Sequence, residues 1–411
     1  MTVNSRLLCP LSYPGSSIII HPLEHFAILF HVVLWDKWIL FSLFVLFTIG
    51  ESIVISVNVV PSLWESYLNM GIYRKPLLQL LVFILGLLLS GVIARVDYRS
   101  YMRGHLPYVF ILLSVLSLLL VLVKKLVLGK PVDRWLLGTS LQPLEFVKLA
   151  LVIFLTSYIL NKGGLQQWKY FLWAIFFPVL IALLLLFQPD KGGAVFVLLL
   201  TAAIIYVGGV PKRVYIILFL LMGLFIHQIL SSGGYVAERL SAWKDPFADP
   251  EEGGYQIIQS IYALARGGPL GVGLGQGIQK MGPLPTADSD YIMATVGEEL
   301  GFMGILTVFI LYGILISRLF YHSLKTQDRM GKLILFGTAI NFALAFLWNT
   351  AMVSNLIPPK GIALPFLSYG PSNLLASMLF IGVAHSVINN QGKSSRSLPK
   401  TSSALTALRH T

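Results

Sequence analysis

The sequence predicts an all-α integral membrane protein with about ten transmembrane helices and one large extracytoplasmic loop between helices seven and eight. Of the 411 residues, 56% are hydrophobic and only 12% are charged, and the mean hydropathy is +0.78. A soluble domain of this length could not bury so much apolar surface, so the bilayer is the expected solvent. A spanning helix needs about 20 predominantly apolar residues, and the chain offers roughly ten such blocks.

The expected spans follow one another closely, and only one connection between them is long. They cover residues 38–58, 77–95, 107–123, 144–160, 170–187, 192–209, 214–230, 303–322, 333–354 and 369–389. A link such as Gly209 to Arg213 is too short to fold alone. The connection over 231–302 is therefore the only loop with room for a functional site.

The two ends of the chain differ from this membrane domain, which we place at residues 35–390. Residues 1–34 are apolar in part, but Pro22, Glu24 and three His in the segment 16–35 make a poor span. We expect a cytoplasmic or interfacial N-terminal segment there. Residues 391–411 are basic and rich in Ser and Thr, which predicts a flexible cytoplasmic tail. No cleavable signal peptide is recognisable, and the single Cys9 excludes an internal disulfide.

Lys and Arg in the short loops predict the orientation, because cytoplasmic loops carry an excess of these residues. With ten spans both termini lie on one side, whose loops hold Arg95, Arg99, Arg103, Lys162, Lys169, Lys212, Arg213, Arg318, Lys325, Arg329 and Lys332. This excess predicts cytoplasmic termini and an outer location for the 231–302 loop. The basic cluster at 124–134 is an exception, because it is predicted to lie on the outer side. Basic residues in that position are placed to bind an anion there.

The net charge of +12 narrows the class of partner. Basic residues are scattered among the loops rather than clustered on one domain, so nucleic acid is not an expected partner. Membrane lipids with anionic headgroups, or an anionic lipid-linked substrate, explain the charge more simply.

Acidic residues gather in the long loop. Nine of the 18 acids lie there: Glu238, Asp245, Asp249, Glu251, Glu252, Asp288, Asp290, Glu298 and Glu299. For Glu251 and Glu252, in the turn-rich "DPFADPEEGGY", a solvated loop position is favoured. Asp288 and Asp290 directly precede the apolar "YIMATV", where desolvation can raise a carboxylate pKa toward the useful range of a general base. Spacing alone leaves both a solvated and a catalytic role open for this pair.

Three further ionisable residues lie at the ends of spans. Glu145 and Lys148 are three residues apart in "LQPLEFVKLAL" and so share one helix face. Ionisable residues in the membrane are functional candidates, but a structural ion pair that seals the bundle is favoured here. Asp190 lies in the turn "FQPDKGGAVF", where capping of the following helix is favoured.

Several apparent motifs carry little weight. "HPLEH" at 21–25 matches a zinc-peptidase pattern, but Pro22 fits only a first helical turn and no third ligand is evident. "GGPLGVGLGQG" at 267–277 follows no strand and misses the G-x-G-x-x-G register, so close backbone packing or flexibility is favoured over phosphate binding. His105, His227, His322, His385 and His410 are isolated and more typical of structural or solvated histidines.

Five segments taken in order give a more specific signal. They are "RWLLGTSLQPLEFVKLAL", "QPDKGGA", "DPFADPEEGGYQIIQSIYALARGGPLGVGLGQGIQK", "LPTADSDYIMATVGEELGFMG" and "IPPKGIALPFLSYGPSNLL". Together with about ten spans, they resemble the SEDS family (shape, elongation, division and sporulation) of bacterial cell-wall glycosyltransferases over residues 130–390. "DPFADP", "GLGQGIQK" and "PPKGIALPF" are more similar to the division branch of the family than to its elongation branch.

The resemblance implies a peptidoglycan glycosyltransferase that polymerises lipid II at the outer face of the bacterial cytoplasmic membrane during cell division. The catalytic Asp of the family's HTDF segment aligns with Asp290. The motif positions imply substrate-binding roles for Arg134, Glu145, Lys148, Asp190, Lys280, Glu298, Glu299, Lys360, Ser368 and Tyr369. For Glu298 and Glu299 a structural role, capping a buried network, is equally open. The implied partners are lipid II, the undecaprenyl-pyrophosphate-linked glycan, a class B penicillin-binding protein (a transpeptidase) and other divisome proteins.

The sequence departs from the family motifs at several positions. Asp288 stands where the family usually has His, and a second carboxylate two residues away would raise the pKa of Asp290 if the two are close. Pro371 replaces Gly and Asn373 replaces Ser in "SYGPS", and Pro removes a backbone N–H. Leu144 replaces Ser, which removes an expected N-cap hydroxyl.

The implied reaction needs a base for the sugar 4-hydroxyl, assigned to Asp290, and stabilisation of the leaving undecaprenyl pyrophosphate. Basic side chains or a divalent cation, Mg²⁺ or Mn²⁺, would supply that stabilisation. The basic candidates on the outer side are Arg134, Lys148, Lys191, Arg239, Lys244, Arg266 and Lys280, and the motif positions rank Arg134 and Lys148 first. The alternatives are a lipid II flippase, an elongation-type polymerase and a non-enzymatic scaffold that recruits a transpeptidase.

Overall fold

A computed structural model describes residues 35–58, 73–129, 134–136, 141–163, 165–209, 235–251 and 253–396, with three single positions at 216, 220 and 223. These residues belong to one compact unit, Leu34–Thr411. The expected N-terminal segment with "HPLEH", the seventh span at 214–230 apart from those single positions, and the last residues of the tail lie outside the described residues.

Every regular element in the described residues is a helix. The long ones are α2 (Lys37–Asn58), α3 (Arg74–Arg95), α5 (Leu106–Val127), α6 (Pro143–Asn161), α7 (Trp168–Phe187), α8 (Lys191–Val207), α12 (Ile292–Lys325), α13 (Arg329–Val353) and α14 (Pro371–Arg396). The short ones are α4 (Tyr98–Met102), α10 (Tyr235–Lys244), α11 (Tyr255–Gly267) and the 3₁₀ helices η3 (Pro246–Ala248) and η4 (Gln279–Met281).

The helices confirm an all-α membrane protein. Among the described residues, eight helices are long and apolar enough to cross a bilayer, and Lys191–Val207 is a shorter apolar helix. These nine correspond to nine of the ten expected spans, most of them within four residues at each end.

The largest boundary error concerns α12. It begins at Ile292, eleven residues before the expected start at 303. Gly301, with φ 67° and ψ −164°, interrupts the helix and separates Ile292–Leu300 from the span that follows. The acids Glu298 and Glu299 made the first segment read as loop, whereas the structure buries both side chains.

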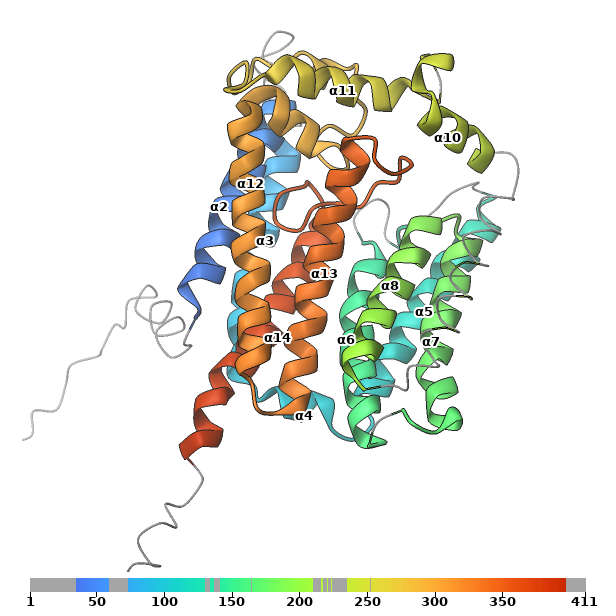
Figure 1. Cartoon of the computed structure of the whole chain (residues 1–411), viewed down its shortest axis with the longest axis vertical. Helices are drawn as coiled ribbons and strands as arrows, with labels where there is room; N and C mark the ends of the chain where they lie inside the picture. The colour runs from blue at the N-terminus through green and yellow to red at the C-terminus, as the bar shows by residue number, and fades with distance from the viewer. Residues whose placement is uncertain are drawn as a thin grey trace, which may run out of the picture. The chain divides into compact units, whose positions relative to one another are not determined.

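The long helices form two groups that meet along α13 and α14 (Figure 1). In one group α3 packs against α14, and α12 packs against both α2 and α13. In the other group α5 contacts α6 and α7, and α8 contacts α6 and α7. Helix α13 contacts α6 and α8, and α14 contacts α6, so these two helices join the groups.

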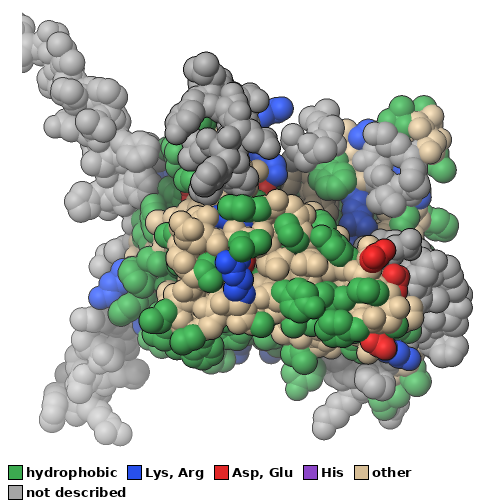
Figure 2. Space-filling model, turned by 90° about the horizontal axis from the view of Figure 1, so that it is seen from above, with side chains coloured by type: hydrophobic (Ala, Val, Ile, Leu, Met, Phe, Trp, Pro, Cys, Tyr) green, Lys and Arg blue, Asp and Glu red, His purple; other side chains and the backbone are tan. Residues whose placement is uncertain are grey.

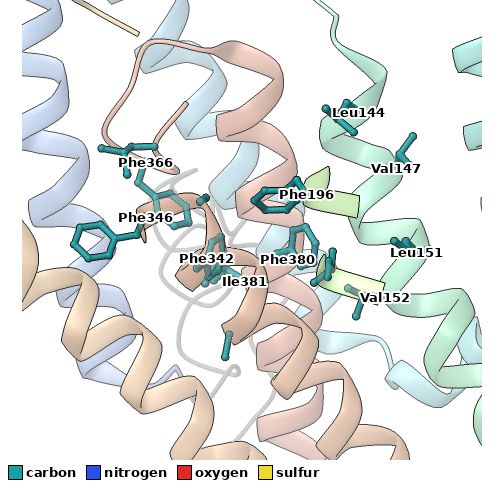
Figure 3. Close-up of a cluster of buried hydrophobic side chains, with 14 of the residues drawn as sticks. Leu144, Val147, Leu151, Val152, Phe196, Phe342, Phe346, Phe366, Phe380 and Ile381 are labelled. Carbon is teal, nitrogen blue, oxygen red and sulfur yellow. The ribbon is translucent and has the colours of Figure 1, made fainter. Parts of the chain in front are cut away.

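Buried apolar side chains fill the space where the groups meet (Figure 3). Phe342 on α13 and Phe380 on α14 lie near Phe196 on α8 and the Leu151 side of α6, and all four side chains are at most 2% exposed. Apolar burial gives little driving force within lipid, so close packing must hold the helices together. Gly382 of α14 illustrates this, because an added Cβ would lie 2.8 Å from Cα of Ser90 on α3.

The connection before α12 covers one end of the bundle. Helix α11 packs against α12, and the glycine-rich segment after it pairs with α12 through bonds such as Val272 N–H to the Glu298 carbonyl, 3.0 Å. A Cβ on Gly267 would lie 1.8 Å from the Gly297 carbonyl oxygen. Close backbone packing therefore explains Gly267, and also Gly271, where a Cβ would lie 2.2 Å from the Glu299 carbonyl oxygen. Seen from above, this end exposes apolar and charged side chains side by side (Figure 2).

Candidate active site

Asp290 lies two residues before α12 and lines a small polar pocket of about 140 Å³. Four segments far apart in the sequence form the pocket. Its lining residues are Arg134, Gln256, Thr286, Asp290, Tyr291, Met352, Pro359, Lys360 and Gly361. The pocket therefore brings one acid, Asp290, together with two of the predicted basic residues, Arg134 and Lys360.

The environment of Asp290 favours a proton acceptor. Burial raises the pKa of its carboxyl group above the ordinary value of 3.8, the nearby charges of Lys360 and Arg134 lower it, and those of Asp190 and Asp288 raise it further. The net result is a raised pKa. A carboxylate with a raised pKa holds a proton more strongly and is a better general base near neutral pH.

Gly361 lies directly against the Asp290 carboxylate. A Cβ at this position would lie 1.8 Å from Asp290 Oδ2 and 2.1 Å from its Cγ. Since no other residue type lacks a Cβ, only glycine allows the carboxylate and this loop to come so close.

The backbone around Asp290 is fixed by the segment between α13 and α14. The amide group of Asn349, on α13, donates to the carbonyls of Asp290 (2.7 Å) and Ile362 (2.9 Å). Ser368 Oγ donates to the Ser289 carbonyl (2.7 Å) and accepts the Leu364 N–H (2.9 Å). Ser368 therefore acts on the position of Asp290 rather than as a residue of the pocket lining.

Tyr369 and Asp288 form a second layer beside Asp290. Tyr369 N–H donates to the Asp288 carbonyl, 2.8 Å. The Asp288 carboxylate pairs with Lys75 of α3 (2.6 Å) and accepts from Asn58 at the end of α2 (3.2 Å). The charge of Asp288 raises the pKa of Asp290, in the direction expected from its position, although burial is the larger cause.

Asp190 and Lys360 form an ion pair at the pocket, with Oδ1 and Nζ 2.6 Å apart. Asp190 also accepts the Gly193 N–H (3.0 Å) as the N-cap of α8, which confirms its predicted capping role. Burial raises the pKa of Asp190, but Lys360 and Arg134 reverse this and hold it below 3.8. Burial lowers the pKa of Lys360, and the charge of Asp190 opposes this.

Among the described members of the basic 124–134 cluster, Arg134 is the one that lines the pocket. Its Nη2 donates to the Pro189 carbonyl, 3.2 Å, which holds the guanidinium beside the turn before α8. Lys124 and Lys125 instead donate to the carbonyls of Trp135 (2.7 Å) and Phe187 (2.8 Å).

Glu145 and Lys148 form a buried ion pair of 2.7 Å in the first turns of α6. Asn373 of α14 donates to Glu145 Oε2 (2.9 Å), so the side chain that departs from the family motif completes this contact. Neither charged residue lines the Asp290 pocket. The expected N-cap at position 144 was wrong, since Gln142 is the N-cap of α6 and its N–H donates to Ser372 Oγ (2.9 Å).

Lys280, Glu298 and Glu299 form a separate buried network. Lys280 Nζ lies 2.5 Å from Glu299 Oε1, and both contact Ser56 Oγ of α2. Glu298 pairs with Arg266 (3.0 Å) and accepts the Ile278 N–H (2.8 Å). These contacts fix the glycine-rich segment onto α12 and α2, and none of the three residues lines the pocket.

The remaining candidates lie elsewhere. Lys191 is the first residue of α8 and Lys244 is an exposed residue at the end of α10, while the side chain of Arg239 lies outside the described residues. His322 and His385 contact Asp36 at the other end of the bundle, with His322 Nε2 2.8 Å from Oδ2 and His385 Nε2 accepting the Asp36 N–H at 3.2 Å. This position supports a structural role for both histidines.

Among the residues of the site that sequence reasoning missed are Gln256, Asn349 and Gly361. Gly361 directly follows Lys360 in "PPKGIALPF", so the motif contained it without indicating its contact with Asp290. Asn349 is a polar residue in an apolar span, and such residues are functional candidates. Gln256 carries no signal of this kind.

Comparison with known proteins identifies the family of the chain. The family model FtsW/RodA/SpoVE, described as cell cycle protein, matches residues 37–393. "Probable peptidoglycan glycosyltransferase FtsW" of Trichlorobacter lovleyi is 36% identical over 316 residues, which cover 74% of this chain and 81% of that protein. The protein of the same name from Legionella pneumophila is 32% identical over 362 residues, covering 86% and 90%.

Solved structures share the fold. A chain described under "Structural coordination of polymerization and crosslinking by a peptidoglycan synthase complex" is similar with a TM-score of 0.68 and 27% identity, over 87% of this chain and 98% of that one. The rod shape determining protein RodA of Thermus thermophilus has a TM-score of 0.61 and 24% identity over the same shares. On the family match and these relatives, the chain belongs to the FtsW/RodA/SpoVE family of cell cycle proteins, the SEDS family that its motifs indicated.

Proposed function

We propose that the protein is a peptidoglycan glycosyltransferase of the FtsW type, which polymerises lipid II during cell division with Asp290 as general base. The observation that carries the proposal is the placement of Asp290, with its raised pKa, in one pocket with Arg134 and Lys360. The relatives named as FtsW glycosyltransferases, at 31–36% identity, support the reaction class and the division role over an elongation role.

The proposed chemical step transfers the growing glycan to the incoming lipid II. The 4-hydroxyl oxygen of lipid II attacks the anomeric carbon of the reducing-end sugar, and a new glycosidic C–O bond forms with inversion. The bond from that carbon to undecaprenyl pyrophosphate breaks, and its electron pair leaves with the pyrophosphate. The hydroxyl proton passes to the Asp290 carboxylate. Such general-base assistance contributes about 10²–10⁴-fold to a rate.

The leaving pyrophosphate gains negative charge as the bond breaks, and cationic groups stabilise it. Arg134 and Lys360 are the cationic side chains of the described pocket lining and are assigned this role. The guanidinium of Arg134 offers a forked set of donors suited to phosphate oxygens. Lys148 and Lys280, which motif position and outer location had suggested, pair with Glu145 and Glu299 and do not line this pocket.

A divalent cation fits this pocket poorly. Mg²⁺ is usually held by one or two carboxylates together with substrate phosphates. Of the two nearby carboxylates, Asp190 is paired with Lys360 and Asp290 is the proposed base. The described part of the chain contains no group of three or more His, Cys, Asp or Glu side chains arranged to hold a metal ion. We therefore assign no step to Mg²⁺ or Mn²⁺.

The proposal includes an orientation and a partner. The Asp290 pocket lies at the outer face of the cytoplasmic membrane, and both termini are cytoplasmic, which the Lys and Arg distribution supports. The partner is a class B penicillin-binding protein, a transpeptidase. The similarity to a chain of a peptidoglycan synthase complex that couples polymerization to crosslinking supports this partner.

The test is polymerisation by the purified protein with its cognate class B penicillin-binding protein. Lipid II is supplied to the wild type and to Asp290→Ala, and glycan strands are resolved by gel electrophoresis. We expect strands from the wild type and none from the variant. Strands from Asp290→Ala at the wild-type rate would exclude Asp290 as the base. Absence of strands from both, with lipid II translocation in vesicles, would instead identify a flippase.

A further inference from the structure

A second cavity, of about 400 Å³, lies at the other end of α13 from the Asp290 pocket. Met352 of α13 lines the Asp290 pocket and Lys332 lines the second cavity. The twenty residues between them correspond to about 30 Å along the helix. That length equals the hydrocarbon thickness of a bilayer, so the second cavity lies at the level of the opposite headgroups.

The cavity lies between the two helix groups. The ends of α6 and α8 form one wall, and the turn between α12 and α13 forms the other. The lining residues are Ile159, Leu160, Gly163, Val207, Gly208, Gly209, Thr326, Gln327, Arg329, Lys332 and Leu333. Nothing in the proposed glycosyltransferase reaction uses any of them.

The wall formed by α13 is cationic. Arg329 and Lys332 lie on the first turn of α13, and neither side chain forms an ion pair with any residue that the structure describes. The acid before them, Asp328, is already engaged, since its carboxylate accepts from Tyr98 Oη and from the Gly331 N–H at 3.2 Å. Among the described residues, the lining therefore holds two positive charges and no compensating acid.

Both walls also carry apolar side chains. Ile159 and Leu333 are almost fully buried, at 1% and 4% exposure, and Leu160 and Val207 are partly buried beside them. An inorganic anion would use the cations but not this surface. A ligand with an anionic group attached to hydrocarbon would use both.

We propose that this cavity binds the headgroup of an anionic phospholipid. The phosphodiester oxygens contact Arg329 and Lys332, and the first acyl carbons pack against Leu160, Val207 and Leu333. Basic pockets between transmembrane helices bind anionic lipid headgroups in this way. Because the cavity separates α6 and α8 from the α12–α13 turn, the bound lipid also links the two helix groups at this end of the bundle.

The test measures lipid binding to the purified full-length chain by native mass spectrometry. Phosphatidylglycerol, phosphatidylcholine and inorganic phosphate are each titrated into the detergent-solubilised protein. The variant Arg329→Gln/Lys332→Gln removes both cations of the cavity. The matched control Lys37→Gln/Lys169→Gln removes two exposed cations outside the cavity lining. A third variant, Val207→Phe, fills the cavity without changing its charge.

We expect phosphatidylglycerol to bind the wild type more tightly than phosphatidylcholine. Neutralising both cavity cations should weaken the binding of phosphatidylglycerol about 30-fold, because each basic residue near an anionic headgroup contributes slightly more than about fivefold to the affinity. The control variant should retain wild-type affinity, and Val207→Phe should lose binding with its charges intact. Equal binding of both lipids, an equal loss in the control, or displacement of phosphatidylglycerol by inorganic phosphate would overturn the assignment.

Discussion

Replacing Gly361 by alanine should inactivate the enzyme while leaving it folded. The added Cβ would lie 1.8 Å from Asp290 Oδ2, whereas ordinary van der Waals contact begins at 3.4 Å. The difference, 3.4 − 1.8, requires a relative movement of about 1.6 Å between the loop and the carboxylate. A displacement of about 1 Å in a catalytic group can reduce a rate about 100-fold. We therefore expect Gly361→Ala to lower the polymerisation rate by at least about 100-fold.

The assay compares initial rates of glycan formation from lipid II by wild type and variant, each purified with the transpeptidase partner. Gly313→Ala is the matched control, because Gly313 lies within α12 and a Cβ there meets no atom within 4 Å. Alanine also favours a helix over glycine by about 1 kcal/mol. The control should retain full activity. A fully active Gly361→Ala would show that the tight contact with Asp290 does not position the base.

Three further predictions follow from the same contacts. The pKa of Asp290 is raised above the ordinary 3.8, so polymerisation should fall as the pH drops through that raised pKa. The same shift stabilises the folded protein below pH 3.8, and this contribution is lost as the pH rises through the raised pKa. At about pH 7, Asp290→Asn should therefore unfold at a higher temperature than the wild type. Asp190→Asn keeps the N-cap of α8 but leaves Lys360 without its ion-pair partner. The free energy of unfolding, measured by thermal unfolding, should fall by about 3 kcal/mol. This value is the lower end of the range for a broken buried pair, because the charge of Asp290 remains near Lys360. Ser56→Ala removes the contacts of Ser56 Oγ with Lys280 and Glu299 and should lower the free energy of unfolding by about 1 kcal/mol in the same measurement. A loss of activity without any loss of stability would contradict a structural role for that network.

The sequence predicted the helices well and their packing hardly at all. Apolar blocks locate most helix ends within a few residues, because the bilayer imposes both composition and length. Apolarity did not locate the start of α12, because Glu298 and Glu299 lie within it. These two acids are buried against partners distant in sequence, such as Ser56 and Arg266. The meeting of α13 with α6 and α8 depends on side-chain shape, which no periodicity reveals.

The site was predicted in part. The family motifs supplied Asp290, Arg134 and Lys360, which do come together in one pocket. Motif position did not distinguish those pocket residues from Lys148, whose charge is satisfied within the bundle. Asn349 was missed because its role is to hold two backbone carbonyls, and a side chain of that kind leaves no mark in the sequence beyond its polarity.

The central claim is that Asp290, and not the neighbouring Asp288, accepts the proton of the attacking hydroxyl. The most direct measurement is the rate of glycan formation by Asp290→Asn and by Asp288→Asn under saturating lipid II. Asn preserves the size of each side chain but cannot act as a base. We expect Asp290→Asn to lose about 10²–10⁴-fold in rate with lipid II affinity retained, and Asp288→Asn to remain active. An active Asp290→Asn, or an equal loss in Asp288→Asn, would contradict the assignment.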